Sequence, residues 1–156
     1  MAEEIERKYL VVNEHWRAAA THSAVYRQGY LTQSGPASVR VRIEGELAFL
    51  NIKSATLGIR RTEFEYAIPL ADARHMLQHL CNGPCVEKIR HFVPVGDKIW
   101  EVDEFTGANA GLVVAEVELL DEHEHVELPL WAGNEVSHDP RYYNVSLVKL
   151  PYSAWQ

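Results

Sequence analysis

Short segments in which apolar and polar residues alternate dominate the chain. A period of two is the pattern of a β-strand that buries one of its faces. Turn sequences such as Ser34-Gly35-Pro36 and Asn82-Gly83-Pro84 separate these segments. The segments with this pattern are residues 4–12, 26–31, 38–43, 47–53, 62–68, 86–93, 98–105 and 112–120. Many short strands at regular spacing predict a mainly β domain, either a sandwich or a barrel.

Helices are predicted to be few. Residues 69–80 place leucine and alanine side chains on one face at helical spacing, and Gly83 follows as a stop signal. Residues 13–20 are also predicted to be helical, with Asn13 as the N-cap. We expect these helices to flank the β-structure.

The last part of the chain predicts two more helical segments. Residues 130–136 are expected to form a short helix. Asp139-Pro140 has the form of an N-cap followed by proline at the first helical position. This pair predicts a C-terminal helix over residues 140–148.

Charged side chains lie two residues apart in most of the predicted strands, so each set projects from one face. The sets are Glu4, Glu6 and Lys8; Arg40 and Arg42; Glu63 and Glu65; Lys88 and Arg90; Glu101 and Asp103; and Glu116 and Glu118. A solvent-facing sheet would give a similar pattern in any single strand. The charges, however, have one sign within most strands, and Ser, Thr and Gln are nearly absent from these positions. The whole set therefore favours a charged lumen that holds a ligand.

The two kinds of charged pair suit two parts of one ligand. Arginine offers planar, bidentate donors to phosphate oxygens, and lysine adds a compact positive charge. Carboxylate pairs provide the oxygen ligands that Mg²⁺ and Mn²⁺ prefer. Either set alone would repel itself in a confined space. The pattern therefore predicts a site for a divalent cation and a polyphosphate.

Composition narrows the classes of function. The 156 residues predict a single domain over residues 1–156. The net charge of −7 argues against a general nucleic-acid surface. No apolar run in the sequence is long enough to span a membrane, and the charged N-terminal segment lacks the apolar stretch of a signal peptide. Cys81 and Cys85 are expected to be reduced thiols, and the protein is expected to be cytoplasmic.

The ordered charged motifs resemble those of the CYTH superfamily, also called triphosphate tunnel metalloenzymes. The segment Glu4-Ile5-Glu6-Arg7-Lys8 is similar to the ExExK signature of that family. The further motifs follow in order: Arg40-Val41-Arg42, Lys53, Glu63-Phe64-Glu65, Lys88-Ile89-Arg90, Trp100-Glu101-Val102-Asp103, Glu116-Val117-Glu118 and the YYNVSL segment of residues 142–147. The resemblance covers essentially the whole chain. It implies an eight-stranded antiparallel β-barrel, or tunnel, with a C-terminal helix that can close one end.

The resemblance also implies roles for individual residues. Two Mg²⁺ or Mn²⁺ ions would be held by Glu4, Glu6, Asp103, Glu116 and Glu118. The phosphates would lie against Lys8, Arg40, Arg42, Lys53, Lys88 and Arg90. Arg61 is preferred to Arg60 for the same wall, because it shares the strand parity of Glu63 and Glu65. Glu63 or Glu65 is a candidate to accept the proton of the attacking water, and Lys8, with a tyrosine such as Tyr30, is a candidate to assist the attacking or leaving oxygen.

Among the activities of that family, the chain is most similar to the short bacterial inorganic triphosphatases, which implies hydrolysis of inorganic triphosphate to pyrophosphate and phosphate. Class IV adenylyl cyclases carry His-Phe shortly before the ExExK motif, and only Met1-Ala2-Glu3 stands there in this chain. The compact chain leaves little material for a pocket that grips a base or a thiazolium ring. The alternatives are a class IV adenylyl cyclase, a thiamine or nucleoside triphosphatase, a non-catalytic polyphosphate-binding module and a structural domain. A homodimer is compatible with the sequence.

Overall fold

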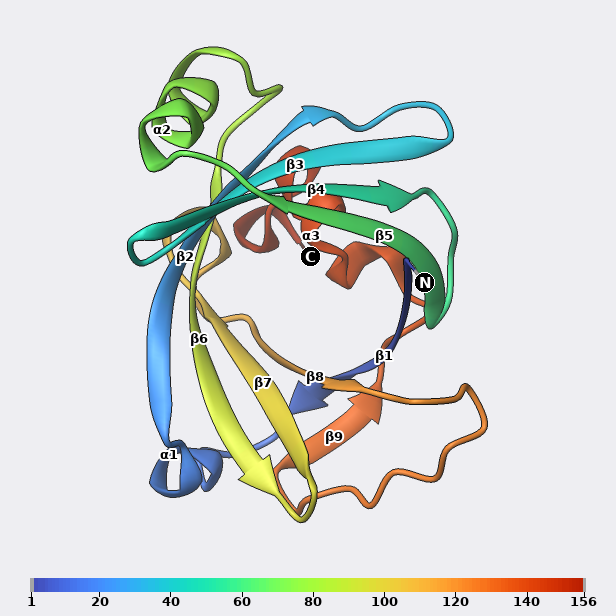
Figure 1. The fold of residues 1–156 in the computed structure, drawn as a ribbon. Coiled ribbons are helices and arrows are strands. Elements are labelled where there is room, and N and C mark those ends of the chain that lie inside the picture. Colours follow the sequence, from blue (N-terminus) through green and yellow to red (C-terminus); the bar gives the residue numbers. More distant parts are fainter. Residues whose placement is uncertain (1, 156) are drawn as a thin grey trace.

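The computed structural model describes residues 2–155. Eight antiparallel strands form a closed β-barrel, and Figure 1 looks into it. Their order around the barrel is β1, β5, β4, β3, β2, β6, β7, β8 and back to β1. Their bounds are β1 (Glu3–Val11), β2 (His22–Thr32), β3 (Ala37–Glu44), β4 (Leu47–Ser54), β5 (Arg60–Ala67), β6 (Val86–Val95), β7 (Lys98–Phe105) and β8 (Val113–Glu118). The predicted eight-stranded barrel is confirmed, and each predicted strand overlaps one of these strands.

Strand β1 closes the barrel by changing its partner part-way along its length. Its residues 3–5 pair with β5, whereas residues 6–10 pair with β8. A ninth strand, β9 (Ala132–Glu135), then pairs with the end of β1. Because a strand has only two edges, β9 continues along the edge that β5 leaves. The N-terminal strand is therefore tied to both the middle and the end of the chain.

Much of the hydrophobic core lies outside the barrel, because the inward face is largely charged. Helix α2 (Leu70–His79) covers the outer surface of β3 and β4, where Leu77 and Val41 belong to one buried cluster. A second cluster lies beneath α1 (Trp16–Ala19) and the segment before β9, and it contains the buried side chains of Trp16, Trp100 and Trp131. These outer clusters supply the apolar burial that a charged interior cannot supply.

One end of the barrel interior is apolar. Along β6, the inward positions change from Arg90 through Lys88 to Val86, and Val86 packs in a cluster with Leu147 and Val148 of α3 (Asn144–Lys149). The other buried members of this cluster are Tyr30, Phe105, Leu112 and Val114. The C-terminal segment, red in Figure 1, lies within the outline of the barrel beneath β3–β5. It packs against the apolar end of the barrel. The charged inward side chains lie nearer the opposite end.

The prediction of a helix over residues 130–136 is wrong. This segment forms β9 instead, with Ala132 opposite Val11 of β1 and Trp131 buried in the outer core. Gly133-Asn134 in its middle has a low helix propensity. Pairing with the free edge of β1 and burial of Trp131 therefore outweigh the helix preference of the neighbouring residues.

The predicted C-terminal helix is split into two parts. Asp139 caps as expected by accepting a hydrogen bond from the backbone N–H of Arg141, but it caps only a 3₁₀ turn, η2 (Pro140–Tyr142). Tyr143 then has an extended backbone, and its hydroxyl donates to the carbonyl of Ser137 at 2.7 Å. Helix α3 begins only after this anchored residue. The remaining 3₁₀ turns are η1 (Gly107–Asn109) and η3 (Tyr152–Ala154).

Helix α1 is shorter than predicted, and Asn13 is not its N-cap. The Asn13 side-chain oxygen instead accepts a hydrogen bond from the backbone N–H of His15 at 2.9 Å and forms the turn before the helix. Within residues 2–155, no helix has the length and apolar character needed to cross a membrane. The single domain over residues 1–156 stays a prediction, and Met1 and Gln156 lie outside the described residues.

Candidate active site

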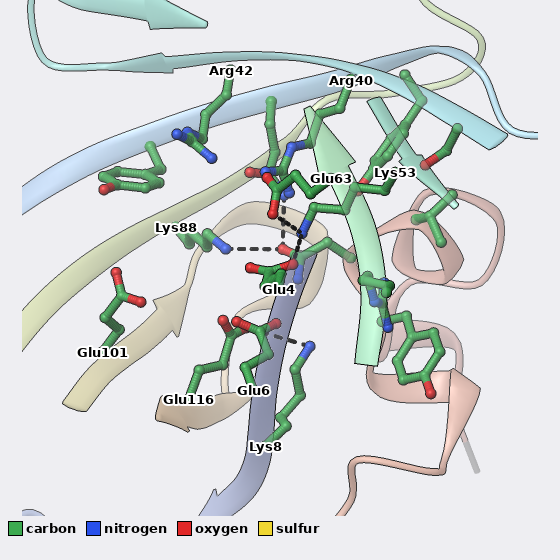
Figure 2. Close-up of a pocket in the computed structure, with 18 of the residues that line it drawn as sticks. Glu4, Glu6, Lys8, Arg40, Arg42, Lys53, Glu63, Lys88, Glu101 and Glu116 are labelled. Atoms are coloured by element: carbon green, nitrogen blue, oxygen red, sulfur yellow. Dashed lines mark hydrogen bonds and ion pairs between the residues drawn. The ribbon is translucent and has the colours of Figure 1, made fainter. Parts of the chain in front are cut away.

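Inward side chains from the barrel strands line one polar pocket, most of which Figure 2 shows. Seven of these side chains are cationic and five are carboxylates. The cations are Lys8, Arg40, Arg42, Lys53, Arg61, Lys88 and Arg90, and the carboxylates are Glu4, Glu6, Glu63, Glu101 and Glu116. The pocket thus carries more basic than acidic side chains, although the whole chain has a net charge of −7. A local excess of cations in a confined space attracts polyanions.

Opposite charges in the pocket lie within reach of one another. Lys53 Nζ is 3.3 Å from the Glu4 carboxylate and 3.7 Å from that of Glu63. Lys8 Nζ is 3.4 Å from the carboxylate of Glu116. Figure 2 shows these side chains converging from β1, β4, β5 and β8. A ligand that combines cations with a polyanion can replace both halves of each pair, so neither charge need be left without a partner.

A largely buried ion network lies next to these pairs. Asp103 has no exposed surface, and it accepts hydrogen bonds from Lys88 Nζ at 2.7 Å and from Arg90 at 2.7 and 2.8 Å. Burial lowers the pKa of Lys88 to about 8, although the Asp103 charge opposes the shift. Burial also works against the ionised form of Asp103, but the charges of Arg90 and Lys88 outweigh it and lower its pKa. Asp103 therefore anchors two cations of the pocket wall.

Three other carboxyl groups of the pocket have raised pKa values, because their surroundings disfavour the charged form. Burial, followed by the negative charges of Glu116 and Glu4, raises the pKa of Glu6 to about 8. Burial raises the pKa of Glu101 to about 7 against the opposing charge of Arg90, and it also raises the pKa of Glu4. A divalent cation would relieve both the burial penalty and the mutual repulsion. Crowded carboxylate oxygens are also the donor set of Mg²⁺ and Mn²⁺, so these residues fit such ions.

The carboxylates are not yet arranged around one point. Among residues 2–155, no three His, Cys, Asp or Glu side chains are grouped closely enough to hold an ion. Glu4 and Glu116 point toward Lys53 and Lys8 instead. Coordination of an ion would therefore require these carboxylates to leave their lysine partners.

A buried asparagine organises another part of the pocket wall. Asn51 of β4 accepts a hydrogen bond from Arg40 Nε at 3.4 Å and donates to Glu63 at 3.2 Å and to Glu65 at 2.9 Å. Glu65 also forms an ion pair with Arg42. Although burial opposes it, the hydrogen bond from Asn51 and the Arg42 charge lower the pKa of Glu65. Glu65 is thereby occupied in holding Arg42 and Asn51.

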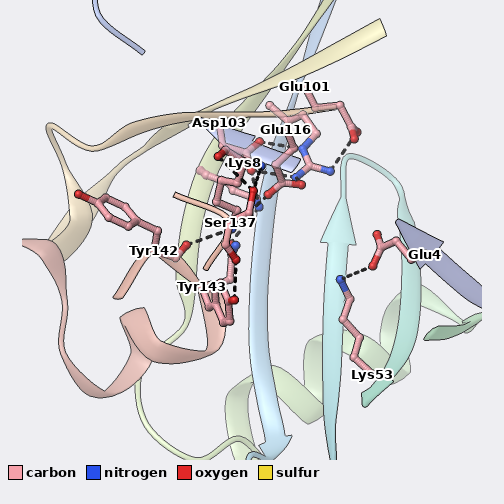
Figure 3. A network of polar contacts seen from close by, with 12 residues as sticks. Glu4, Lys8, Lys53, Glu101, Asp103, Glu116, Ser137, Tyr142 and Tyr143 are labelled. Carbon is pink, nitrogen blue, oxygen red and sulfur yellow. Dashed lines mark hydrogen bonds and ion pairs between the residues drawn. The ribbon is translucent and has the colours of Figure 1, made fainter. Parts of the chain in front are cut away.

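Most of the site residues expected from the sequence come together in this pocket, and three do not line it. Asp103 lies behind the wall, where Lys88 and Arg90 pair with it. Figure 3 shows Asp103 within this polar network. Glu65 is exposed near the C-terminal end of β5, and Glu118 is exposed at the end of β8. Glu101, which the sequence placed beside Asp103 on β7 but not among the metal ligands, does line the pocket.

Several neutral residues of the pocket carry no signal in the charge pattern. Tyr26, Gln28 and Tyr30 alternate along β2 and all face the pocket. Tyr30 was expected there from the sequence, and the period of two that links it to Tyr26 and Gln28 is the signal that identifies the other two. The others, Ser38, Gly58, Ser137, Tyr143, Asn144 and Val145, come mainly from segments without that alternation.

Comparison with known proteins gives consistent matches over nearly the whole chain. A family model described as the CYTH domain matches residues 2–147. A protein of Acetivibrio thermocellus named inorganic triphosphatase is 44% identical over 152 residues, which cover 97% of each chain. A second protein of that name, from Nitrosomonas europaea, is 36% identical over 148 residues, 92% of this chain and 95% of the relative. The crystal structure of an inorganic triphosphatase is 35% identical, covers 93% of this chain and 97% of its own, and has a TM-score of 0.68.

Proposed function

Because the chain belongs to the CYTH domain family, we propose that it hydrolyses inorganic triphosphate to pyrophosphate and phosphate inside the barrel. The two relatives described above carry the name inorganic triphosphatase and match more than nine tenths of the chain. The single observation that carries this function is the pocket in which cationic and carboxylate side chains interleave within a closed barrel.

The lining of the pocket favours triphosphate itself over a triphosphate ester. A base or a thiazolium ring needs a free apolar or aromatic surface. The guanidinium of Arg90 lies 4.9 Å from the ring centre of Tyr26, and that of Arg61 lies 5.2 Å from that of Tyr143, so cations already cover these two rings. The third ring of the lining, Tyr30, is buried in the apolar cluster at the end of the barrel. The C-terminal segment also contributes Tyr143, Asn144 and Val145 to the lining. Little surface is left for an organic group.

In this function the carboxylates would bind the metal ions, and the lysine and arginine side chains would bind the phosphates. Glu4, Glu6 and Glu116, with Glu101 beside them, would hold the Mg²⁺ or Mn²⁺ ions, of which we expect two. Such ions neutralise phosphate charge and lower the pKa of a bound water. Asp103 and Glu118 are not placed among these ligands, because Asp103 lies behind the wall and Glu118 is exposed outside the pocket.

The remaining residues act on the phosphates and on protons. The arginine and lysine side chains would stabilise the charge that develops on the phosphoryl oxygens. Glu63 is the better candidate to accept the proton of the attacking water, because it lines the pocket while Glu65 is held by Asn51 and Arg42. Lys8 Nζ, which donates to the carbonyl of Tyr142 at 3.0 Å, would assist the attacking or leaving oxygen.

Purified protein is expected to release phosphate from tripolyphosphate with Mg²⁺ or Mn²⁺, and EDTA is expected to reduce this release by about 100-fold or more. The assay compares tripolyphosphate, ATP and thiamine triphosphate in parallel. Conversion of ATP to pyrophosphate and a cyclic nucleotide would instead identify a cyclase. Tight binding of tripolyphosphate without turnover would identify a binding module, and absence of any thermal stabilisation by tripolyphosphate would leave a structural domain.

Arg60 and Arg61 provide a matched pair for testing whether phosphate binds in the pocket. Arg61 lines the pocket, whereas Arg60 lies outside it and pairs with Glu3 and Glu122. Replacing Arg61 by alanine is expected to lower kcat/KM for tripolyphosphate by about 10-fold or more, because a hydrogen bond to a charged group contributes about 1.5–3 kcal/mol. Arg60→Ala is expected to stay within about twofold of the wild type, since exposed ion pairs contribute little. Equal losses in the two variants would contradict this placement.

We also place the protein in the cytoplasm, with a small-molecule triphosphate as its partner. Cys81 and Cys85 are free thiols, which fits a reducing compartment. The excess of cations lies in the pocket of an acidic protein, so no nucleic-acid partner is expected. A homodimer stays compatible with these observations, and sedimentation analysis would measure the oligomeric state.

A further inference from the structure

Gln28 is a buried polar residue whose hydrogen bonding is only half complete. It lies in the middle of β2, faces the pocket and has no exposed surface. Its Nε2 donates to Asn144 Oδ1 at 2.7 Å, whereas its Oε1 is a buried acceptor with no hydrogen-bond donor among residues 2–155. Leaving a buried acceptor without a donor costs about 1–3 kcal/mol, and such groups are rare in folded proteins. The Gln28 oxygen therefore requires a donor that the described chain does not supply.

The neighbours of Gln28 determine which atom of its amide group, the oxygen or the nitrogen, has no hydrogen-bond partner. Lys88 Nζ can only donate; it is held by Asp103 at 2.7 Å, and it also donates to Asn144 Oδ1 at 3.0 Å. Asn144 must therefore turn its oxygen toward Lys88. Gln28 can meet that same oxygen only with its NH₂ group, because turning the amide over would bring two oxygens together. The charge of Asp103 thus fixes the orientation of Gln28 through Lys88 and Asn144.

The chemistry of the pocket limits what can meet this acceptor. The triphosphate chain offers oxygens that accept hydrogen bonds, and its cations do not donate them. The lysine and arginine side chains of the pocket also carry hydrogen, but among residues 2–155 none of them donates to Gln28 Oε1. Of the components of the reaction, water is then the donor. A neutral amide can accept from water without adding to the negative charge that repels the polyphosphate, whereas Glu63 and Glu116 are already close to Lys53 and Lys8. In GTPases a glutamine side chain orients the attacking water in this way.

We propose that Gln28 orients the attacking water, with its Oε1 accepting one hydrogen of that water, and that Asn144 is the positioning residue that keeps Oε1 turned toward it. This inference rests on the proposed triphosphatase function. The water oxygen forms a bond to the terminal phosphorus, and the bridging P–O bond breaks with its electron pair leaving on pyrophosphate. One hydrogen stays on the new phosphate oxygen, and the other leaves as a proton to a carboxylate such as Glu63. The Gln28 amide is unchanged by the step.

Gln28→Met tests the orientation of water, because methionine fills a similar volume without an acceptor. We expect kcat for tripolyphosphate to fall by about 10-fold or more. Loss of orientation raises the activation free energy for attack by water but leaves the affinity for tripolyphosphate unchanged. KM, and the affinity for tripolyphosphate measured calorimetrically in EDTA, are expected to stay within about twofold. The matched control is Gln33→Met, because Gln33 also has a buried oxygen without a donor but lies outside the pocket. This control is expected to keep the wild-type kcat.

Asn144→Ala is the second variant, and it decides the question if Gln28→Met fails to fold. It leaves Gln28 in place but frees its amide to turn, so kcat is expected to fall by about threefold to 10-fold with KM unchanged. An unchanged kcat in Gln28→Met would overturn the proposed role of Gln28 and leave the triphosphatase function standing. If Gln28→Met is unfolded, an unchanged kcat in Asn144→Ala would have the same meaning. Equal losses of affinity and kcat would also overturn it, since Gln28 would then act in binding. A wild-type protein that releases no phosphate would overturn the triphosphatase function and this inference together.

Discussion

Replacing Glu6 by glutamine is expected to lower metal-dependent phosphate release by about 100-fold or more and, at the same time, to stabilise the metal-free fold. The activity falls because a carboxylate that would hold the divalent cation is removed. The stability rises because an amide carries no charge that is penalised by burial or repelled by Glu116 and Glu4. Phosphate release and urea unfolding in EDTA measure the two effects. Residues that serve function at the expense of stability commonly behave in this way.

The sign of the pH dependence gives this variant a second readout. The pKa of Glu6 is about 8 in the folded protein and 4.5 for an ordinary glutamate. Between these values the folded state binds more protons than the unfolded state, so this group's contribution to stability falls as pH rises from about 4.5 through 8. The gain from Glu6→Gln is therefore expected to grow over that range. Glu118→Gln is the matched control, because Glu118 lies opposite Glu6 in the strand register but is exposed; a loss of activity there would contradict the assignment.

Asp103→Asn is expected to destabilise the protein by about 3–5 kcal/mol, because it removes the carboxylate that Lys88 and Arg90 share and leaves the buried Lys88 ammonium without its nearest counter-charge. Lys88 and Arg90 both depend on this carboxylate, and the asparagine NH₂ group would face donors. Chemical denaturation measures the free energy of unfolding. Tripolyphosphate hydrolysis is expected to fall as well, since both cations line the pocket.

The neighbouring Glu104 supplies the control for this effect. It lies on the same strand but on the outer face, where it pairs with Arg17 at 2.7 Å and with His91 at 3.2 Å. Glu104→Gln is expected to change the free energy of unfolding by less than about 1 kcal/mol, because the pairs are partly exposed. If Asp103→Asn cost no more than Glu104→Gln, the buried network would not be the structural anchor described here.

The alternation of residues predicted the barrel and the inward face of its strands well, because a period of two determines the face of a strand regardless of its neighbours. It could not predict the height of each residue along the barrel axis. Asp103 and Glu118 have the parity of pocket residues, yet Asp103 lies behind the wall and Glu118 is exposed beyond it. Height depends on strand register and tilt, and both are set by pairings distant in sequence.

The sequence also could not predict residues whose role depends on a partner in space. Gln28, Asn51 and Asn144 carry no charge, and their importance lies in the hydrogen bonds that connect them to Lys88, Arg40 and Glu63. Likewise, residues 132–135 form a strand because β1 offers them a free edge. Local propensity contains no information about such an edge.

The change of partner along β1 makes assembly of the site a late event in folding. Every strand that pairs with β1 follows it in the chain, and the backbone of Lys8 is hydrogen-bonded to Ser137, 129 residues away. During synthesis, the first strand must wait for the last third of the chain. Contacts of such long range predict slow folding. Until β8 and β9 arrive, β1 and β7 expose unpaired edges that other chains could join, so high expression is expected to require protection from aggregation.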